Sequence, residues 1–334
     1  MRHSRGQYEI EVTDLQDVLS RIGEGDCVVT DKNVRDAVGL ESEHFAIEPG
    51  EQSKSLEVYS EVLDWLADRA SRSSRLIALG GGVVGDLAGF CAATFMRGVE
   101  LVQVPTSLLA MVDSSVGGKV GIDLPKGKNL AGSFWPPSAV WVPIDALKTL
   151  PDRHFINGSA EVWKYAFVMC PELYERLRSR PLEAGHDDID EIVTKCIDLK
   201  RQVVEEDEHE TTGRRAILNF GHTVGHAVEQ ALGYKGLLHG EAISIGMVVE
   251  ARLAERLGVA EKGLSDEISV SLKSQGLPTS LEEKLDPDDL IGAMARDKKA
   301  DRNGLAFSLV SSIGTCKLYT SVDEGAVRQV LEEM

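Results

Sequence analysis

The sequence has few cysteines, and no two of them have the spacing of a metal-binding or redox motif. The five are odd in number and scattered through 334 residues. This pattern argues against a disulfide scaffold and against a thiolate zinc site. It fits a reducing compartment, so we expect the protein in the cytoplasm.

Basic residues are also scarce, since 36 Lys and Arg stand against 54 Asp and Glu and leave a net charge of −18. Nucleic acid is not an expected partner, because phosphate backbones are bound through clustered Lys and Arg. No apolar run reaches the roughly 18–20 residues that span a bilayer, so no membrane partner is expected. The first residues, MRHSRGQ, lead into no apolar segment and predict no secretory signal.

What the chain does contain is a change of pattern near Pro151. Before it, short apolar runs at Cys27–Thr30, Leu76–Leu79 and Leu101–Val104 alternate with a helix-period segment over 55–70. This rhythm predicts an α/β, Rossmann-like nucleotide-binding domain over residues 1–150. Helix-period segments dominate after it, which predicts a mainly α-helical domain over 151–334. Those segments are 156–170, 188–206, 221–232, 241–257 and 265–275.

A glycine-rich segment follows the second of these predicted strands. Residues 80–86, GGGVVGD, satisfy the pattern GxGxxG and precede a helical segment. Glycines there let the backbone approach a pyrophosphate at a helix N-terminus, although a plain tight turn would give the same pattern. The next strand carries Glu100 at its start and no acid at its end, so a standard Rossmann site is not indicated. Asp31, at the tip of an earlier strand, is the better candidate for the ribose hydroxyls.

Two histidines lie four residues apart in NFGHTVGH, which places His222 and His226 on one helix face. A pair at this spacing alone is more often packing than a metal site. Glu161 in one predicted helix and His239 just before another supply further ligand types. Three nitrogen and oxygen ligands with an open position are typical of a catalytic zinc site. Spacing alone does not show that these residues meet.

Several cations are embedded in motifs in spite of the acid excess. Lys119 follows two glycines, Lys128 lies between Gly127 and Asn129, and Arg215 precedes Asn219 by four residues. Isolated lysines are usually solvated surface residues. Charge-assisted hydrogen bonds are each worth about 1.5–3 kcal/mol, so a group of such cations could hold a substrate with two anionic groups.

Together these segments resemble the 3-dehydroquinate synthases. The resemblance rests on GGGVVGDLAGFCAATFMRG, VQVPTSLLAMVDSSVGGKVGIDLPKGKNLAGSF, LKTLP, GSAEVWKYA, KRQVVEEDEHE, RAILNFGHTVGHAVE, LHGEAISIGM and DKK. It implies an enzyme that converts 3-deoxy-D-arabino-heptulosonate 7-phosphate into 3-dehydroquinate and phosphate in the shikimate pathway. It also implies catalytic NAD+, a zinc ion that cobalt could replace, and a homodimer.

The resemblance assigns roles to individual residues. The implied metal ligands are Glu161, His222 and His239. The implied nucleotide-binding residues are Asp31, Glu51, Lys54, Gly81, Gly82, Val83, Asp86, Thr106, Ser107, Lys128 and Thr149. The implied catalytic and substrate-binding residues are Asp113, Lys119, Asn129, Lys164, Lys200, Arg215, Asn219, His226, Lys298 and Lys299, with Lys128 also lining the pocket. Arg97 is implied to reach the neighbouring subunit, and Glu210 to pair with His226 in proton transfer.

Two departures and several alternatives accompany this assignment. The family usually has one residue fewer between the positions of Glu210 and Arg215, which weakens the assignment of Glu210, and Trp163 replaces a usual aliphatic residue.

Sister sugar phosphate cyclases usually change several of the pocket residues that stand here, whereas an enzyme for an aminated quinate would keep them. Glycerol-1-phosphate and iron-type alcohol dehydrogenases share the architecture but lack the paired motifs DSSVGGK and NFGHTVGH. A non-catalytic binding relative would be expected to have lost ligands or cations.

Overall fold

The structure is a computed structural model that describes residues 8–207, 213–297 and 304–334. The chain forms two compact units, Met1–Phe155 with Ala184–Arg201 and Ile156–Glu183 with Gln202–Met334. The divisions at 155 and 201 fall inside helices α5 (Asp152–Met169) and α7 (Ile189–Glu206). A segment from the later half of the chain thus groups with the first unit, whereas the sequence analysis divided the chain at a single point.

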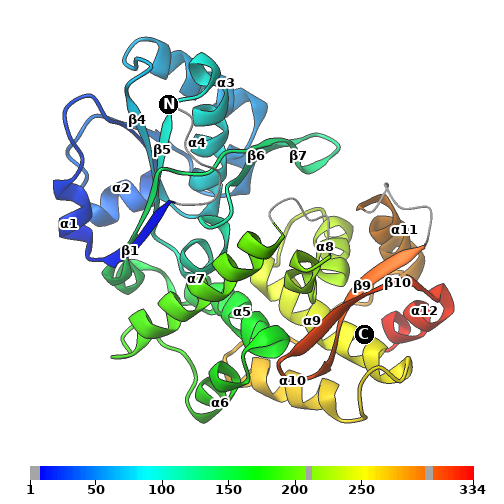
Figure 1. Cartoon of the computed structure of the whole chain (residues 1–334). Helices are drawn as coiled ribbons and strands as arrows, with labels where there is room; N and C mark the ends of the chain where they lie inside the picture. The colour runs from blue at the N-terminus through cyan, green and yellow to red at the C-terminus, as the bar shows by residue number, and fades with distance from the viewer. Residues whose placement is uncertain (1–7, 208–212, 298–303) are drawn as a thin grey trace. The chain divides into compact units, whose positions relative to one another are not determined.

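The first unit is built on a six-stranded parallel sheet with the order β1-β8-β5-β4-β2-β3 (Figure 1). Helices cover both faces of this sheet, as parallel sheets require. The strands are β1 (Glu9–Thr13), β2 (Cys27–Asp31), β3 (His44–Ile47), β4 (Arg75–Gly80), β5 (Glu100–Pro105) and β8 (Ala139–Pro143). The helices are α1 (Leu15–Ser20), α2 (Lys32–Val38), α3 (Leu56–Ala67) and α4 (Gly82–Thr94).

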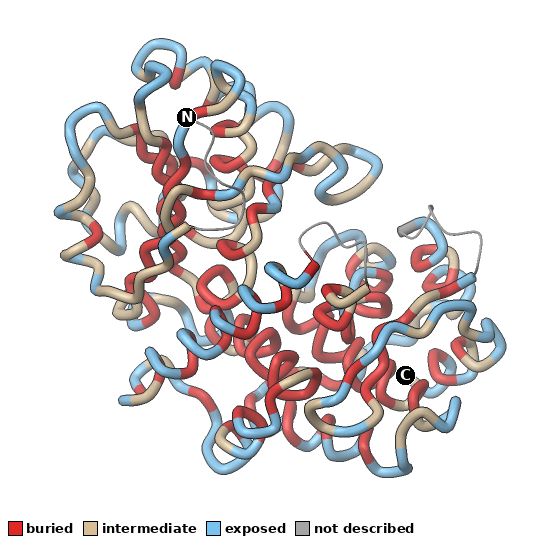
Figure 2. The backbone as a smooth tube through the Cα atoms, in the orientation of Figure 1, coloured by how far each residue is buried: buried red, intermediate tan, exposed pale blue. Residues whose placement is uncertain are grey.

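Both faces of the central strands are apolar, and successive residues face opposite cores. In β4, Leu76 and Ala78 pack into the core that includes residues of α3 and α4, whereas Ile77 and Leu79 pack into the core beside α1 and α2. This alternation follows from the period of two residues in a strand. Figure 2 shows the central strands as buried backbone. Continuous apolar runs in the sequence therefore mark strands that are buried on both sides.

The strand order reverses between β2 and β4. The chain leaves β2 toward β3 on one side and then returns to β4 on the other side, from which it continues to β5. In open α/β sheets, ligands bind at the carboxyl ends of the strands where the order reverses. Asp31 ends β2, and the glycine-rich segment follows β4, so both lie at this switch point.

The rest of the first unit consists of short elements beside the sheet. An antiparallel hairpin pairs β6 (Lys119–Leu124) with β7 (Gly127–Phe134). The short helices are η1 (Glu51–Ser53), η2 (Phe95–Arg97), η3 (Ala110–Ser114) and η4 (Ile144–Thr149).

The second unit is mainly helical. Its helix α9 (His239–Arg256) is buried along most of its length (Figure 2). The core around α9 includes residues of α8, α11, α12 and β9. Among the described helices, none combines the length and apolar character needed to cross a bilayer. The other elements are α6 (Pro171–Ser179), η5 (Arg215–Asn219), α8 (His222–Ala231), α10 (Leu264–Ser274), α11 (Pro287–Asp297), β9 (Leu305–Ser312), β10 (Thr315–Val322) and α12 (Glu324–Glu332).

The predicted fold class is confirmed, with a parallel sheet and its helices near the N-terminus and a mainly helical region after it. The helices expected over 156–170, 188–206, 221–232, 241–257 and 265–275 correspond to α5, α7, α8, α9 and α10. The hairpin β6–β7 was not predicted from the sequence. Its two strands contain three glycines together with Asp123 and Asn129, and these residue types are depleted in strands and hide the strand pattern.

Candidate functional site

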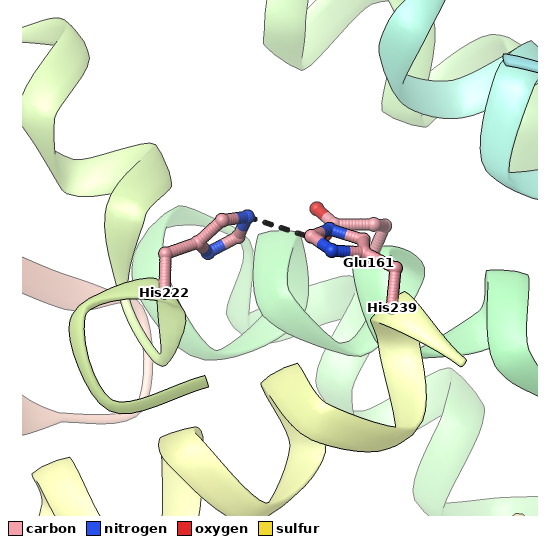
Figure 3. Close-up of side chains that lie close together, drawn as sticks. All are labelled: Glu161, His222 and His239. Carbon is pink, nitrogen blue, oxygen red and sulfur yellow. Dashed lines mark ion pairs between the residues drawn. The ribbon is translucent and has the colours of Figure 1, made fainter. Parts of the chain in front are cut away.

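Three helices of the second unit bring Glu161, His222 and His239 together (Figure 3). Glu161 lies on α5, and the histidines are the first residues of α8 and α9. Nε2 of His222 is 3.5 Å from Oε1 of Glu161, and Nε2 of His239 is 3.8 Å from the same oxygen. One potential ligand atom from each residue lies within 4.8 Å of the others. The grouping expected from the sequence therefore exists in space.

The other ring nitrogen of each histidine faces a hydrogen-bond acceptor. Nδ1 of His222 lies 3.2 Å from the carbonyl oxygen of Phe220, and Nδ1 of His239 lies 3.5 Å from Oε2 of Glu229. A neutral imidazole that donates through Nδ1 keeps its lone pair on Nε2. Both lone pairs then point toward the Glu161 carboxylate.

The Glu161 side chain is fully buried, and its Oε1 has no hydrogen-bond partner among the described residues. Its Oε2 forms an ion pair with Lys164, one turn later on α5. Burying a carboxylate oxygen without a partner is costly, and a divalent cation would remove that cost. The donor set of one carboxylate and two imidazoles suits a zinc-type ion with an open coordination position. These residues therefore fit a metal ion.

A close backbone contact joins the start of α9 to α5. The N–H group of Gly240, next to His239, donates to Oδ1 of Asn157 on α5 at 2.6 Å. A Cβ on Gly240 would lie 1.9 Å from the carbonyl oxygen of Asn157, so only glycine permits this approach. Asn157 precedes Glu161 by one helical turn, and the contact thereby fixes the start of α9 beside the carboxylate.

A buried carboxylate holds the start of α8. Glu250 on α9 is fully buried and accepts hydrogen bonds from the N–H groups of Gly221 at 2.7 Å and Val224 at 3.1 Å. The first N–H groups of a helix have no partner within the helix, and a negative charge is favourable there. Glu250 thus positions the helical turn that carries His222.

The remaining described candidates of the second unit lie on α5, η5 and α8. Lys164 is buried beside Glu161. Arg215 is also buried, and its backbone N–H donates to Oδ2 of Asp207 at 3.0 Å. The ring of His226 lies 5.3 Å from that of His222, centroid to centroid. Asn219 is exposed at the end of η5.

In the first unit, several predicted nucleotide-binding residues form a charged cluster around Lys54. The buried Nζ of Lys54 lies 2.8 Å from Oδ2 of Asp86 and 3.5 Å from Oε1 of Glu51, and Nζ of Lys128 lies 3.7 Å from that same oxygen. Burial alone would lower the pKa of Lys54, but the carboxylates of Asp86 and Glu51 hold it above its ordinary value. Burial raises the pKa of Asp86.

Asp123 on β6 joins this cluster to Asn129. Its carboxylate lies 4.0 Å from Nζ of Lys54 and accepts the backbone N–H of Asn129 at 2.8 Å. Asn129 has a positive φ of 54°, a conformation that asparagine tolerates better than most residues. The hairpin β6–β7 is thereby joined to the cluster.

The glycine-rich turn meets the end of the neighbouring strand. The N–H group of Thr106 donates to the carbonyl oxygen of Gly80 at 2.9 Å. A Cβ on Gly81 would lie 3.5 Å from Oγ of Ser107, and one on Gly82 would lie 3.1 Å from Oγ of Ser114. Val83 lies in the first turn of α4. The backbone of the glycine-rich turn therefore lies close to the hydroxyl groups of Ser107 and Ser114.

Two other members of the nucleotide set have local hydrogen bonds. Asp31 caps α2, since its Oδ1 accepts the N–H of Val34 at 3.0 Å. The hydroxyl of Thr149 donates to the carbonyl oxygen of Ala146 at 2.8 Å.

Lys200 and Asp113 form a direct pair within the first unit. Nζ of the buried Lys200 lies 2.7 Å from Oδ1 of Asp113 and 2.6 Å from its backbone oxygen. Lys119 is exposed at the start of β6. Arg97 is exposed with a positive φ of 68°, and no hydrogen bond or ion pair joins it to another described residue. Glu210, Lys298 and Lys299 lie outside the described residues.

Sequence reasoning missed three acids that support these groups: Asp123, Glu229 and Glu250. Glu229 follows His226 by three residues on the same helix, so helical periodicity could have identified it. Glu250 carries no local signal, because its partners lie 26 or more residues away. Asp123 lies six residues from Asn129 but 69 residues from Lys54, so its place in the cluster around Lys54 cannot be read from the sequence.

The fold and the sites define a two-unit protein with a nucleotide-type switch point in one unit and a candidate metal centre in the other. Two family models match consecutive parts of the chain, the 3-dehydroquinate synthase N-terminal model over residues 44–157 and the C-terminal model over 158–300. The chain belongs to the 3-dehydroquinate synthase family.

The chain is also similar to individual proteins of known name. The chain is 45% identical over 280 residues to the 3-dehydroquinate synthase of Rhodopirellula baltica, which covers 83% of this chain and 74% of that protein. A 2-deoxy-scyllo-inosose synthase solved with carbaglucose-6-phosphate, NAD+ and Co2+ matches with a TM-score of 0.84 at 25% identity, covering 98% of this chain and 96% of that one.

A second solved structure supports the fold alone. The 2-epi-5-epi-valiolone synthase of Streptomyces hygroscopicus subsp. jinggangensis, with NAD+ and Zn2+ bound, matches with a TM-score of 0.88 at 24% identity. The match covers all of this chain and 98% of that one.

Proposed function

We propose that the chain is a 3-dehydroquinate synthase, which converts 3-deoxy-D-arabino-heptulosonate 7-phosphate into 3-dehydroquinate and phosphate. The observation that carries the proposal is the convergence of Glu161, His222 and His239 from three helices in a chain of this family. The proposed cofactors are a divalent zinc-type ion and NAD+, since the related 2-deoxy-scyllo-inosose synthase was solved with NAD+ and Co2+.

Glu161, His222 and His239 are the proposed metal ligands. The bound ion would act as a Lewis acid on a substrate hydroxyl, and NAD+ would take up and return a hydride. Each histidine turns Nδ1 toward an oxygen atom and Nε2 toward Glu161, so a tautomer protonated at Nδ1 would offer its Nε2 lone pair to the ion. Lys164 counterbalances the buried carboxylate.

The switch point of the first unit is the proposed nucleotide site. The glycine turn offers backbone N–H groups at the start of α4 to a pyrophosphate. Asp31, at the end of β2, is proposed for the ribose hydroxyls, and it would have to share its carboxylate with the cap of α2. The remaining proposed nucleotide-binding residues are Glu51, Lys54, Gly81, Gly82, Val83, Asp86, Thr106, Ser107, Lys128 and Thr149.

Several cations are proposed to bind the anionic groups of the substrate. Lys200 is held by Asp113, so its ammonium is preoriented and loses little conformational freedom on binding. His226, whose ring adjoins that of His222, is proposed to transfer the proton of the reacting hydroxyl. The other proposed substrate-binding residues are Lys119, Asn129, Lys164, Arg215 and Asn219, together with Glu210, Lys298 and Lys299 outside the described residues.

A homodimer in the cytoplasm completes the proposal. Arg97 is exposed in a left-handed backbone conformation beside the exposed side chain of Met96. Backbone in sparsely populated conformations clusters at functional sites. Arg97 is proposed to reach the site of the neighbouring subunit. The five cysteines are all buried and free of disulfides, which is consistent with a reducing compartment.

The test is phosphate release from the proposed substrate by the wild-type chain and by the variants Glu161→Gln and His222→Ala, with zinc per chain measured in parallel. We expect both variants to lose zinc and activity together, because each removes a ligand. Glu267→Gln is the matched control, since this acid of the same unit bonds to Tyr174 and not to the candidate centre.

Other substrates distinguish the sister activities. Sedoheptulose 7-phosphate and glucose 6-phosphate should release no phosphate. Turnover of either one, with none on the proposed substrate, would assign the chain to another sugar phosphate cyclase activity. Full activity of both ligand variants would overturn the proposed metal centre.

A further inference from the structure

His239 lies between two buried carboxylates that face its two ring nitrogens. Nε2 lies 3.8 Å from Oε1 of Glu161, whereas Nδ1 lies 3.5 Å from Oε2 of Glu229. Glu229 is 5% exposed and comes from α8, the helix that also carries His222. One helix therefore supplies a proposed metal ligand and a contact to another ligand.

Two arrangements of a cation are compatible with these residues. Glu161, His222 and His239 form one possible group of ligands, and His226, Glu229 and His239 form another. Both groups need His239, and a neutral imidazole has one lone pair for a metal. If Nδ1 of His239 donates its proton to Glu229, only Nε2 is available, and the ion belongs beside Glu161.

We propose that Glu229 is a positioning residue for the metal centre. Its carboxylate accepts the Nδ1–H of His239, fixes the tautomer with the lone pair on Nε2 and sets the rotation of the ring. A carboxylate behind a ligating histidine also makes the imidazole a stronger donor. This inference rests on the proposed metal centre.

The effect of such a contact on metal binding is measurable. Loss of an outer hydrogen bond to a ligand typically costs about 10–100-fold in metal affinity. Glu229→Gln removes the charge but keeps the size and the helix-compatible side chain. We expect the zinc dissociation constant to rise by about 10–100-fold, with one zinc ion per chain in the wild type and the variant.

The experiment titrates zinc into the metal-free full-length chain against a chromophoric chelator, and records the visible spectrum of the cobalt-substituted protein. Glu267→Gln is the matched control, with an expected affinity within about twofold of wild type, because its carboxylate bonds to Tyr174 instead. The cobalt bands should change in Glu229→Gln and not in the control. Thermal unfolding of the metal-free proteins checks that each variant is folded.

If Glu229→Gln does not fold, the same measurements are made on Glu229→Asp. This variant keeps the charge, but its shorter side chain moves the carboxylate away from Nδ1 of His239. Unchanged zinc affinity and cobalt spectrum would overturn the positioning role while leaving the proposed centre intact. Two zinc ions in the wild type and one in the variant would show that Glu229 is itself a ligand. Wild-type zinc affinity in Glu161→Gln would overturn both proposals.

Discussion

Gly246 on α9 lies directly against Gly221 at the start of α8. A Cβ built on Gly246 would lie 2.0 Å from the carbonyl oxygen of Gly221. A side chain at this position would therefore require the backbone to move. The obstacle is backbone and not a flexible side chain, so the two helices must separate to accept any larger residue. Because the two helices begin with His222 and His239, this contact sets the distance between the proposed ligands.

The variant Gly246→Ala should therefore lose both stability and metal affinity. Overpacking of a close interface costs about 1–3 kcal/mol of stability. Separation of the two helices would also increase the distance between His222 and His239. Chemical unfolding and zinc titration measure the two effects. Gly185→Ala is the control, because an added Cβ at that position meets nothing within 4 Å. Wild-type zinc affinity in Gly246→Ala would contradict the importance of this contact.

Glu250→Gln should destabilise the protein by about 1–3 kcal/mol, because each carboxylate oxygen of Glu250 accepts one backbone N–H and the amide nitrogen that replaces one oxygen cannot accept. Zinc affinity should fall as well, since the first turn of α8 carries His222. Chemical denaturation and zinc titration provide the measurement.

The matched control is Glu255→Gln on the same helix. Glu255 accepts the N–H groups of Gly263 at 3.1 Å and Ser265 at 2.7 Å near the start of α10, which carries no proposed ligand. The variant Glu255→Gln should leave zinc affinity unchanged. Equal loss of zinc affinity in both variants would refute a specific role for Glu250.

The sequence predicted the parts that depend on local pattern. Buried strands such as Leu76–Leu79 are visible as apolar runs, and the spacing of His222 and His226 follows from helical geometry. The sequence could not predict Glu250, because a buried carboxylate is identified only by the distant backbone N–H groups that compensate it. Asp123 could not be predicted because the ammonium of Lys54 that it faces is distant in the sequence. Likewise, nothing local indicates that the segment around Lys200 packs with the first unit.

The ion pair of Asp26 with Arg75 predicts a pH-dependent contribution to stability. Burial alone would raise the pKa of Asp26, but the hydrogen bonds from Arg75 and from the N–H of Gly23 outweigh it and lower the pKa below its ordinary value of 3.8. A carboxyl group with a lowered pKa in the folded state stabilises the fold above its ordinary pKa. That contribution is lost as the pH falls through the folded-state pKa.

Asp26→Asn should therefore be less stable than wild type near pH 7, and the difference should shrink as the pH falls below 3.8. Urea denaturation of both proteins at a series of pH values measures this difference in the free energy of unfolding. Asp36→Asn is the control, because the ion pair of Asp36 with its neighbour Arg35 is largely exposed and screened by solvent. A difference that stays constant down to the lowest pH would contradict the assignment.

Lys119→Ala should nearly abolish phosphate release and leave the unfolding transition unchanged, because Lys119 is exposed and is proposed to bind the substrate. Lys126→Ala, in the turn of the same hairpin, is the matched control and should retain activity. A fully active Lys119→Ala enzyme would remove Lys119 from the proposed substrate-binding set.

The most direct test of the proposed function is the ratio of phosphate released to NAD+ supplied. The purified chain is mixed with 3-deoxy-D-arabino-heptulosonate 7-phosphate, zinc and a trace of NAD+, and phosphate is followed beside the absorbance of NADH. We predict many phosphates per NAD+, no net NADH, and loss of turnover on addition of a chelator. Steady accumulation of NADH, or no phosphate release from this substrate, would contradict the proposal.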